Sequence, residues 1–195
     1  MQTGLLACMT TPAQGNVIPD NALYACDNGK FGKGWPGASA WFAWLAETLD
    51  RYGRERCLWA LAPDVPTDAE ATLAESAPWL EGIRGLGIRA AFAAQDGSEH
   101  GLVPWESFDV LFLAGSTAWK TGPAAHRLAL QARSHGLDVH MDRVNSRRRL
   151  RIAQDFGCTS CDGTCLSFGP AINLPRLLAW MNELHAAPTA FGDST

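Results

Sequence analysis

The sequence has no long hydrophobic run and no excess of basic residues. No apolar stretch approaches the roughly 20 residues that cross a bilayer, and the N-terminus lacks the basic segment that begins a signal peptide. With 16 Lys and Arg against 20 Asp and Glu, the net charge is −4, which excludes a uniformly basic nucleic-acid-binding protein. We therefore expect a cytoplasmic protein with no membrane partner, in which any phosphate contact comes from a local basic cluster.

The sequence also offers little for a metal site. Six cysteines in a cytoplasmic chain are expected as thiols rather than as disulfides. Cys158, Cys161 and Cys165 have the spacing C-x2-C-x3-C, which is only partly that of a zinc site because a fourth ligand is missing. We expect structural thiols, no metal and no cofactor. A metal-dependent barrel hydrolase that uses these cysteines is the alternative.

Apolar runs alternate with helical patterns along the chain, without the turn signals of a β-hairpin. This order predicts parallel strands joined by right-handed crossovers. Seven strands are expected, at residues 4–9, 24–26, 57–62, 88–94, 109–114, 138–141 and 159–161. The predicted fold class is α/β, a small or incomplete TIM-type (β/α) barrel with seven to eight parallel strands. We expect a single domain over residues 1–187 and a disordered tail over residues 188–195.

Five segments end an apolar run with a small or polar group. They are YACDNG (24–29), WALAPD (59–64), AFAAQDG (91–97), FLAGST (112–117) and GCTSCDGTCLSFG (157–169). Each alone is explained by a residue that caps the following helix. Together they favour a barrel, because the carboxyl ends of all its strands meet at the face that carries active sites. In an open sheet only the strands at the switch point supply ligands.

These segments resemble those of a known family. CDNGKFG resembles the D-S-G-G-F-Q signature of tRNA-guanine transglycosylases, and GCTSCDGT resembles their second aspartate motif. APD, AAQDG, LAGST and DVHMDRVNSRRRL stand between them in the family's order. The sequence is more similar still to the phage and bacterial DpdA family, small relatives that insert 7-deazaguanines into DNA, over about residues 5–180. The zinc insertion of the tRNA enzymes is missing.

The resemblance implies a glycosyltransferase (a pentosyltransferase) that replaces guanine in DNA with free 7-cyano-7-deazaguanine or a derivative. It implies the cytoplasm of a bacterium or of a phage-infected host, with tRNA as the alternative substrate. Base exchange passes through an oxocarbenium-like state and needs two carboxylates, one to attack C1′ and one to move the proton of the base. The matched motifs make Asp162 the nucleophile and Asp27 the acid/base. An Asx-turn at Asp-Asn-Gly is the structural alternative for Asp27.

Base-binding residues are implied at the other strand ends. Asp64 is expected to accept from the donor edge of guanine, and Gln95 and the Gly115 N–H are expected to face O6 or the 7-substituent. The full expected set is Asp64, Gln95, Gly115, Ser116 and Met141. Candidates for stacking on the base are Phe31, Trp35 and Met141, each with a place in the core as the alternative. Asp68 and Asp96 are further candidates, with helix capping as the alternative.

Five arginines fall within residues 143–151. Residues 147–149 point in three directions on a helix, so they cannot form a single row of ion pairs. At the start of a helix beside the strand ends they are expected to surround a backbone phosphate, with a solvated helix face as the alternative. The expected nucleic-acid contacts are Lys30, Lys33, Lys120, Arg143, Arg147, Arg148 and Arg149. A non-catalytic nucleic-acid-binding relative would keep the arginines and tolerate the loss of Asp27 and Asp162.

Overall fold

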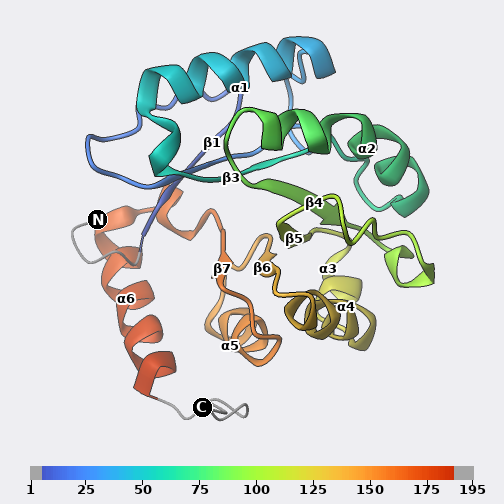
Figure 1. Cartoon of the computed structure of the whole chain (residues 1–195). Coiled ribbons are helices and arrows are strands. Elements are labelled where there is room, and N and C mark those ends of the chain that lie inside the picture. Colours follow the sequence, from blue (N-terminus) through green and yellow to red (C-terminus); the bar gives the residue numbers. More distant parts are fainter. Residues whose placement is uncertain (1–5, 187–195) are drawn as a thin grey trace.

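Seven parallel strands form one sheet, in which each strand pairs with the next strand along the chain. The computed structural model describes residues 6–186. The strands are β1 (Cys8–Thr10), β2 (Tyr24–Cys26), β3 (Cys57–Leu61), β4 (Ala90–Ala94), β5 (Val110–Leu113), β6 (Asp138–Met141) and β7 (Ser160–Cys161). The sheet curls into a half-barrel with helices outside it (Figure 1). The predicted fold class, an incomplete α/β barrel, is therefore confirmed.

Helices lie in most of the connections between strands, outside the sheet, and one more helix follows β7. They are α1 (Ala38–Tyr52), α2 (Ala69–Gly85), α3 (Thr117–Lys120), α4 (Pro123–Ser134), α5 (Arg147–Asp155) and α6 (Pro170–Ala186), with short 3-10 helices at Arg54–Arg56, Ser98–His100 and Cys165–Ser167. Local sequence explains several starts. Asp68 caps α2 by accepting from the Ala71 N–H at 3.0 Å, and the Ser146 hydroxyl caps α5 by accepting from the Arg149 N–H at 3.3 Å. Such caps satisfy N–H groups that have no partner within the helix. Helix α3 was not predicted.

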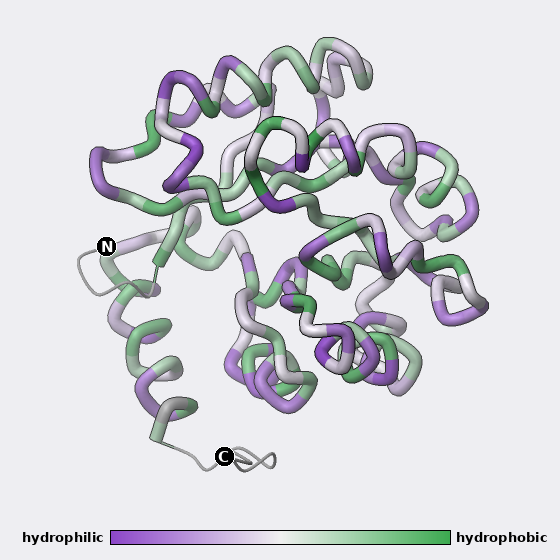
Figure 2. The backbone as a smooth tube through the Cα atoms, viewed as in Figure 1, coloured by the Kyte–Doolittle hydropathy of each residue, from purple (hydrophilic) through white to green (hydrophobic). Residues whose placement is uncertain are grey.

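Side chains alternate between two hydrophobic clusters along the strands, as the period of two of a β-strand requires. In β5, Leu111 and Leu113 belong to a cluster that includes helix residues, so they face outward. Val110 and Phe112 belong to a second cluster with Trp59, in which no helix residue takes part, so they face the inside of the barrel. Strands buried on both faces are typical of parallel sheets, and Figure 2 shows the central strands as mainly hydrophobic.

Some expectations concern the ends of the chain. The predicted disordered tail, residues 188–195, lies outside the described residues, and so do residues 4–5 of the first predicted strand. The first strand itself runs from Cys8 to Thr10, later than the apolar run suggested. Within the part of the chain that the structure describes, no helix is both long enough and apolar enough to cross a membrane.

The outer cluster gives a direct test of the fold. Leu113→Ala removes a fully buried side chain and leaves a cavity, so it should lower the free energy of unfolding by about 2–5 kcal/mol. Leu130→Ala, at a position on α4 that is 40% exposed, should change it by only about 0.5 kcal/mol. Chemical denaturation measures both variants. Equal losses would mean that Leu113 does not lie in the core.

Candidate active site at the carboxyl ends of the strands

Acidic side chains that follow different strands gather at the carboxyl end of the half-barrel. Asp27 follows β2, Asp64 follows β3, Asp142 follows β6 and Asp162 follows β7. The charges of Asp64, Asp162 and Asp142 all raise the pKa of Asp27, so the four carboxylates share one region. The structure therefore brings together three aspartates that the sequence singled out and adds Asp142, which the sequence analysis missed. Asp142 could have been found, because it follows a predicted strand directly.

Asp27 combines a turn with an unusual protonation equilibrium. Its Oδ1 accepts a 2.7 Å hydrogen bond from the Gly29 N–H, which is the Asx-turn considered above as its structural alternative. Burial raises the pKa of Asp27 to about 7, although the Gly29 N–H lowers it, and the nearby carboxylates raise it further. A carboxyl group that is half protonated near neutral pH can both give and take a proton. The turn and an acid/base role are therefore compatible.

Asp162 has one oxygen engaged and the other open. Its Oδ1 accepts from the Arg143 N–H at 3.1 Å and lies 3.2 Å from Nε2 of His140. Within residues 6–186 no hydrogen bond is formed to Oδ2, and the side chain is 23% exposed. The next residue is Gly163, where a Cβ would lie 2.5 Å from Oδ1 of Asn145. The absence of a side chain lets the loop that contains Asn145 pack closely beside Asp162. Oδ1 of Asp162 is therefore hydrogen-bonded within the protein, whereas Oδ2 has no hydrogen bond in the described part of the chain.

The residues expected to read a base are hydrogen-bonded to one another. The buried carboxylate of Asp64 accepts from Nδ2 of Asn28 at 2.8 Å and from Nε2 of Gln95 at 2.7 Å. Oε1 of Gln95 in turn accepts from the N–H groups of Gly115 and Thr67, both at 2.9 Å. Asn28, which sequence reasoning missed inside its turn motif, is only 1% exposed. Both oxygens of the Asp64 carboxylate therefore have donors within the protein itself.

Ser116 and Asp96 form a second contact between strand ends. Asp96 accepts from both the N–H and the hydroxyl of Ser116, each at 2.6 Å, and the same hydroxyl accepts from the Trp119 N–H at 3.3 Å. Gly115 has a φ of +44°, and a Cβ there would lie 2.5 Å from the Trp119 ring. These contacts give Gly115 and Ser116 a structural role at the start of α3. Their role in binding a base stays a prediction.

Two of the expected site residues are buried rather than accessible. Met141 is fully buried in the outer cluster, because the register of β6 turns it toward the helices, so the prediction that it stacks on a base is wrong. Lys120 is fully buried at the end of α3 rather than exposed in a loop, and its Nζ lies 3.3 Å from Oδ2 of Asp142. The prediction that Lys120 contacts phosphate is therefore wrong. Burial lowers the pKa of Lys120, and burial together with the charge of Asp162 raises the pKa of Asp142.

Arg143 connects this buried pair to the site entrance. Its Nε donates to Asp142 at 2.5 Å and its Nη2 donates to the Gly115 carbonyl at 2.6 Å. Its guanidinium also lies 4.6 Å from the centre of the Phe31 ring, which is 69% exposed. The Arg143 guanidinium therefore binds other groups of the protein in this structure, and its contact with nucleic acid stays a prediction. Phe31 is the accessible aromatic ring beside it.

The other basic residues of the predicted set divide into paired and open ones. Lys30 pairs with Glu75 and lies 5.4 Å from the centre of the half-buried Trp35 ring, whereas Lys33 is exposed in the loop before α1. Arg147 pairs with Glu183 on α6, so its side chain is not grouped with those of Arg148 and Arg149. Fewer basic side chains are therefore open to a phosphate than the sequence suggested.

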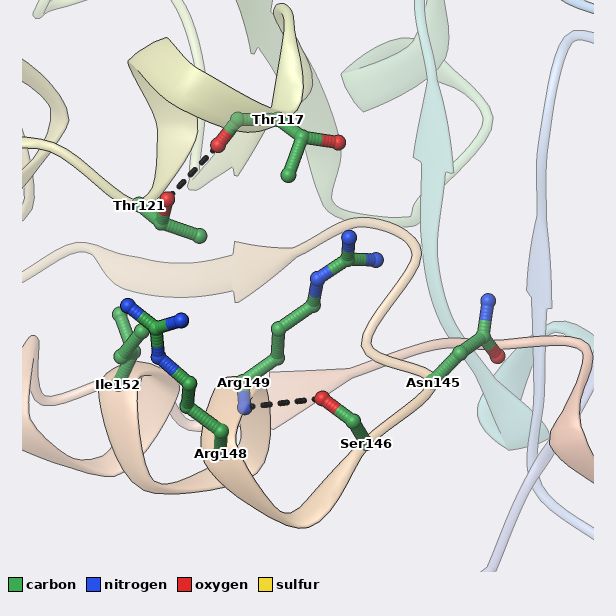
Figure 3. A pocket seen from close by; sticks show the side chains of 7 residues that line it. All are labelled: Thr117, Thr121, Asn145, Ser146, Arg148, Arg149 and Ile152. Carbon is green, nitrogen blue, oxygen red and sulfur yellow. Dashed lines mark hydrogen bonds between the residues drawn. The ribbon is translucent and has the colours of Figure 1, made fainter.

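Arg148 and Arg149 line a pocket of about 400 Å³ between α3 and the start of α5 (Figure 3). Its lining residues are Thr117, Thr121, Asn145, Ser146, Arg148, Arg149 and Ile152. Arg149 donates to the Arg143 carbonyl at 3.1 Å, which ties the pocket to the loop beside Asp162. The pocket is therefore rich in hydrogen-bond donors and positively charged.

The cysteines are all free thiols. Burial raises the pKa of Cys158, and burial together with the charge of Asp162 raises the pKa of Cys161 to about 11. Both thiols are therefore protonated at neutral pH, and a neutral thiol is a weak nucleophile. No group of three or more His, Cys, Asp or Glu side chains between residues 6 and 186 is arranged to hold a metal ion.

No protein-family model and no curated protein sequence matches this chain. Solved structures do match. Native KDPGal aldolase aligns with a TM-score of 0.51 at 15% identity, over 86% of this chain and 72% of the aldolase. The Bacillus subtilis YkuI protein, which has an EAL domain and was solved with its substrate c-di-GMP and calcium, aligns with a TM-score of 0.51 at 15% identity, over 86% of this chain and 44% of YkuI.

A putative glycerophosphoryl diester phosphodiesterase from Agrobacterium tumefaciens aligns with a TM-score of 0.50 at 14% identity, over 80% of this chain and 60% of that protein. These neighbours are TIM-barrel enzymes, and none is a transglycosylase. This chain therefore spans less than two thirds of YkuI and of the phosphodiesterase. At such identities the likeness establishes the barrel fold alone.

The protonation of Asp27 is testable without any substrate. Carbon-13 NMR of the carboxyl group should give a midpoint near pH 7, the pKa that burial produces, against about 3.9 in an unfolded chain. Folded Asp27 binds its proton more tightly, so the stability from this proton is full below about pH 4 and is lost as the pH rises through 7. Asp27→Asn should remove that loss in denaturation experiments. A midpoint below pH 5 would contradict the site's electrostatics.

Proposed function

We propose that this protein is a DNA guanine transglycosylase that replaces guanine with 7-cyano-7-deazaguanine or a derivative of it. The observation that carries the proposal is the pairing of two carboxyl groups with different environments. Asp27 has a pKa of about 7, whereas Asp162 has one oxygen bound and one open. Paired carboxyl groups of different character supply an acid/base and a nucleophile in glycosyl transfer. The motifs that resemble the transglycosylases assign the same two residues.

In the first step, Oδ2 of Asp162 attacks C1′ of the target deoxyguanosine, and the bond from C1′ to N9 breaks. The electron pair of that bond leaves with the base, and protonated Asp27 gives its proton to the departing guanine. C1′ passes through an oxocarbenium-like state. The products of this step are free guanine and an ester between Asp162 and C1′.

In the second step, a free 7-deazaguanine occupies the place of guanine. Asp27, now deprotonated, accepts the N9 proton of the incoming base, and N9 attacks C1′. The bond between C1′ and Oδ2 breaks, and its electrons restore the carboxylate of Asp162. Because Asp27 gives a proton in one step and takes one in the next, a pKa near the working pH serves both. No group is oxidised or reduced.

Recognition of the base centres on Asp64. In the free protein, the amide groups of Asn28 and Gln95 donate to its two oxygens. Guanine presents two donors on one edge, N1–H and the 2-amine, which can take over these acceptor positions. The exchange of partners keeps a buried carboxylate hydrogen-bonded with or without the base, as burial requires. The exposed Phe31 and the half-buried Trp35 are the remaining candidates to stack on a base that has left the DNA helix.

The arginine-lined pocket is the proposed contact for the DNA backbone. Arg148 and Arg149 both line it, with their guanidinium groups turned in different directions (Figure 3), and the loop before α5 joins this pocket to the strand that precedes Asp142. A flipped nucleotide is positioned by contacts to its flanking phosphates. A local contact of this kind is also consistent with a net charge of −4.

The function is tested by nucleoside mass spectrometry after co-expression with a 7-deazaguanine pathway. A 7-deazaguanine nucleoside should be found in DNA only when the protein is present. The modified nucleoside in tRNA instead would assign the tRNA substrate. Folded, expressed protein with no modified nucleoside in DNA or tRNA would overturn the proposal.

The nucleophile is tested by Asp162→Asn, which keeps the size of the side chain and removes its charge. Base exchange should fall at least about 1,000-fold, and the covalent protein–DNA adduct should disappear from denaturing gels. DNA affinity should stay within about twofold, because backbone contacts dominate affinity. Asp155→Asn, on the exposed face of α5, is the matched control and should exchange bases at the wild-type rate. Full activity in Asp162→Asn would remove Asp162 from the mechanism.

Substitutions at two neighbouring arginines test the proposed contact with phosphate. Arg148→Ala should weaken binding to all DNA sequences and reduce the log–log salt dependence of affinity by about 0.9. Arg147→Ala is the control, because Arg147 already pairs with Glu183, and it should leave that slope unchanged. Fluorescence anisotropy at several salt concentrations measures both. A larger effect from Arg147 would place the DNA along α6 instead.

A further inference from the structure

His140 is a buried histidine inside the half-barrel that the sequence analysis did not single out. It is 2% exposed, and its ring packs with its centre 4.8 Å from the ring centres of both Phe112 and Trp59. The cluster that contains Phe112 and Trp59 is otherwise made of alanine, leucine and valine. An imidazole among such side chains must have its nitrogen atoms hydrogen-bonded, because an unsatisfied buried polar group is costly.

Both nitrogen atoms of His140 have partners on or beside β7. Nδ1 lies 2.8 Å from the hydroxyl oxygen of Ser160, and Nε2 lies 3.2 Å from Oδ1 of Asp162. An ionised carboxylate only accepts hydrogen bonds, so Nε2 carries a proton and donates it. In neutral His140, Nδ1 then accepts from the Ser160 hydroxyl. The two contacts together fix the Nε2–H tautomer.

The contact between His140 and Asp162 matters for the orientation of the Asp162 side chain. Asp162 follows β7, a strand of two residues, and precedes a glycine, so the backbone alone gives its side chain little restraint. His140 comes from the adjacent strand β6, which pairs with β7 through Met141 and Cys161. Its ring is fixed by aromatic packing and by Ser160. It therefore provides a rigid point from which the orientation of the Asp162 carboxylate can be set.

We propose that His140 is the positioning residue for the nucleophile: it binds Oδ1 of Asp162 so that Oδ2 faces C1′. This inference rests on the proposed transglycosylase function. The proton stays on Nε2 throughout. When the bond between C1′ and Oδ2 breaks in the second step, negative charge returns to the carboxylate, and the Nε2–H group stabilises it. The Arg143 N–H donates to the same oxygen.

Two amide substitutions separate positioning from packing. The amide nitrogen of glutamine in His140→Gln reaches the place of Nε2, whereas that of asparagine in His140→Asn reaches only the place of Nδ1. His140→Gln should form the covalent DNA adduct within about 10-fold of the wild-type rate. His140→Asn should lose about 100-fold, because misplaced reacting atoms have an effect of that size. DNA affinity and the thermal unfolding midpoint should match between the two variants. Equal adduct rates in both would overturn the inference.

Two further measurements make the outcome unambiguous. His135→Asn, at an exposed histidine after α4, applies the same substitution outside the site and should leave the adduct rate unchanged. If the wild-type protein forms no adduct at all, the proposed function fails, and nitrogen-15 NMR of the imidazoles without DNA then tests the contact itself. Neutral His140 must be the Nε2–H tautomer. An Nδ1–H tautomer would overturn the positioning role whatever the activity.

Discussion

The buried carboxylate of Asp64 determines how the loops at the mouth of the half-barrel are arranged. A carboxylate in this position needs donors, and they come from Asn28 after β2 and Gln95 after β4. Gln95 then uses its other atom to accept from Gly115 after β5. One charge therefore connects the ends of four neighbouring strands through hydrogen bonds that are specific in direction. Apolar packing holds the body of the barrel, whereas this polar network fixes the face at which Asp27 and Asp162 meet.

The same end of the barrel concentrates negative charge and partly neutralises it from within. Four aspartates act on one another electrostatically, and the nearest buried cation is Lys120, which pairs with Asp142. Because Asp142 has both Lys120 and Arg143 as partners, it is the most compensated of the four. Asp27 has no cationic partner among the described residues, and burial raises its pKa to about 7. Burial is the largest cause of the raised pKa of Asp27, Asp64 and Asp142, and nearby cations oppose it at Asp64 and Asp142.

The fold and the main carboxylates could be predicted from the sequence, because alternating apolar runs and the polar groups after them are local signals. Contacts between segments that are distant in the sequence could not be predicted in this way. The sequence does not show that Met141 faces the helices, since a one-residue difference in a strand exchanges the two faces. Neither α3 nor the pairing of Lys120 with Asp142 has a local signal, so the burial of Lys120 is not predictable. Nothing in the strand sequence sets His140 apart, and the partner of Arg147, Glu183, lies far along the chain.

The sheet has two free edges, since β1 and β7 are not paired with each other in the order of strands found for residues 6–186. In a closed barrel, hydrogen bonds around the full circumference fix the distance between any two strands. Here the sheet connects Asp27 to Asp162 through the successive strand pairings from β2 to β7, and the hydrogen bonds at the strand ends are added to that path. Small changes in the angle between neighbouring strands add together over that path. The gap between the two carboxylates is therefore less constrained by the sheet than it would be in a closed barrel, and it depends on the accumulated twist of the strands.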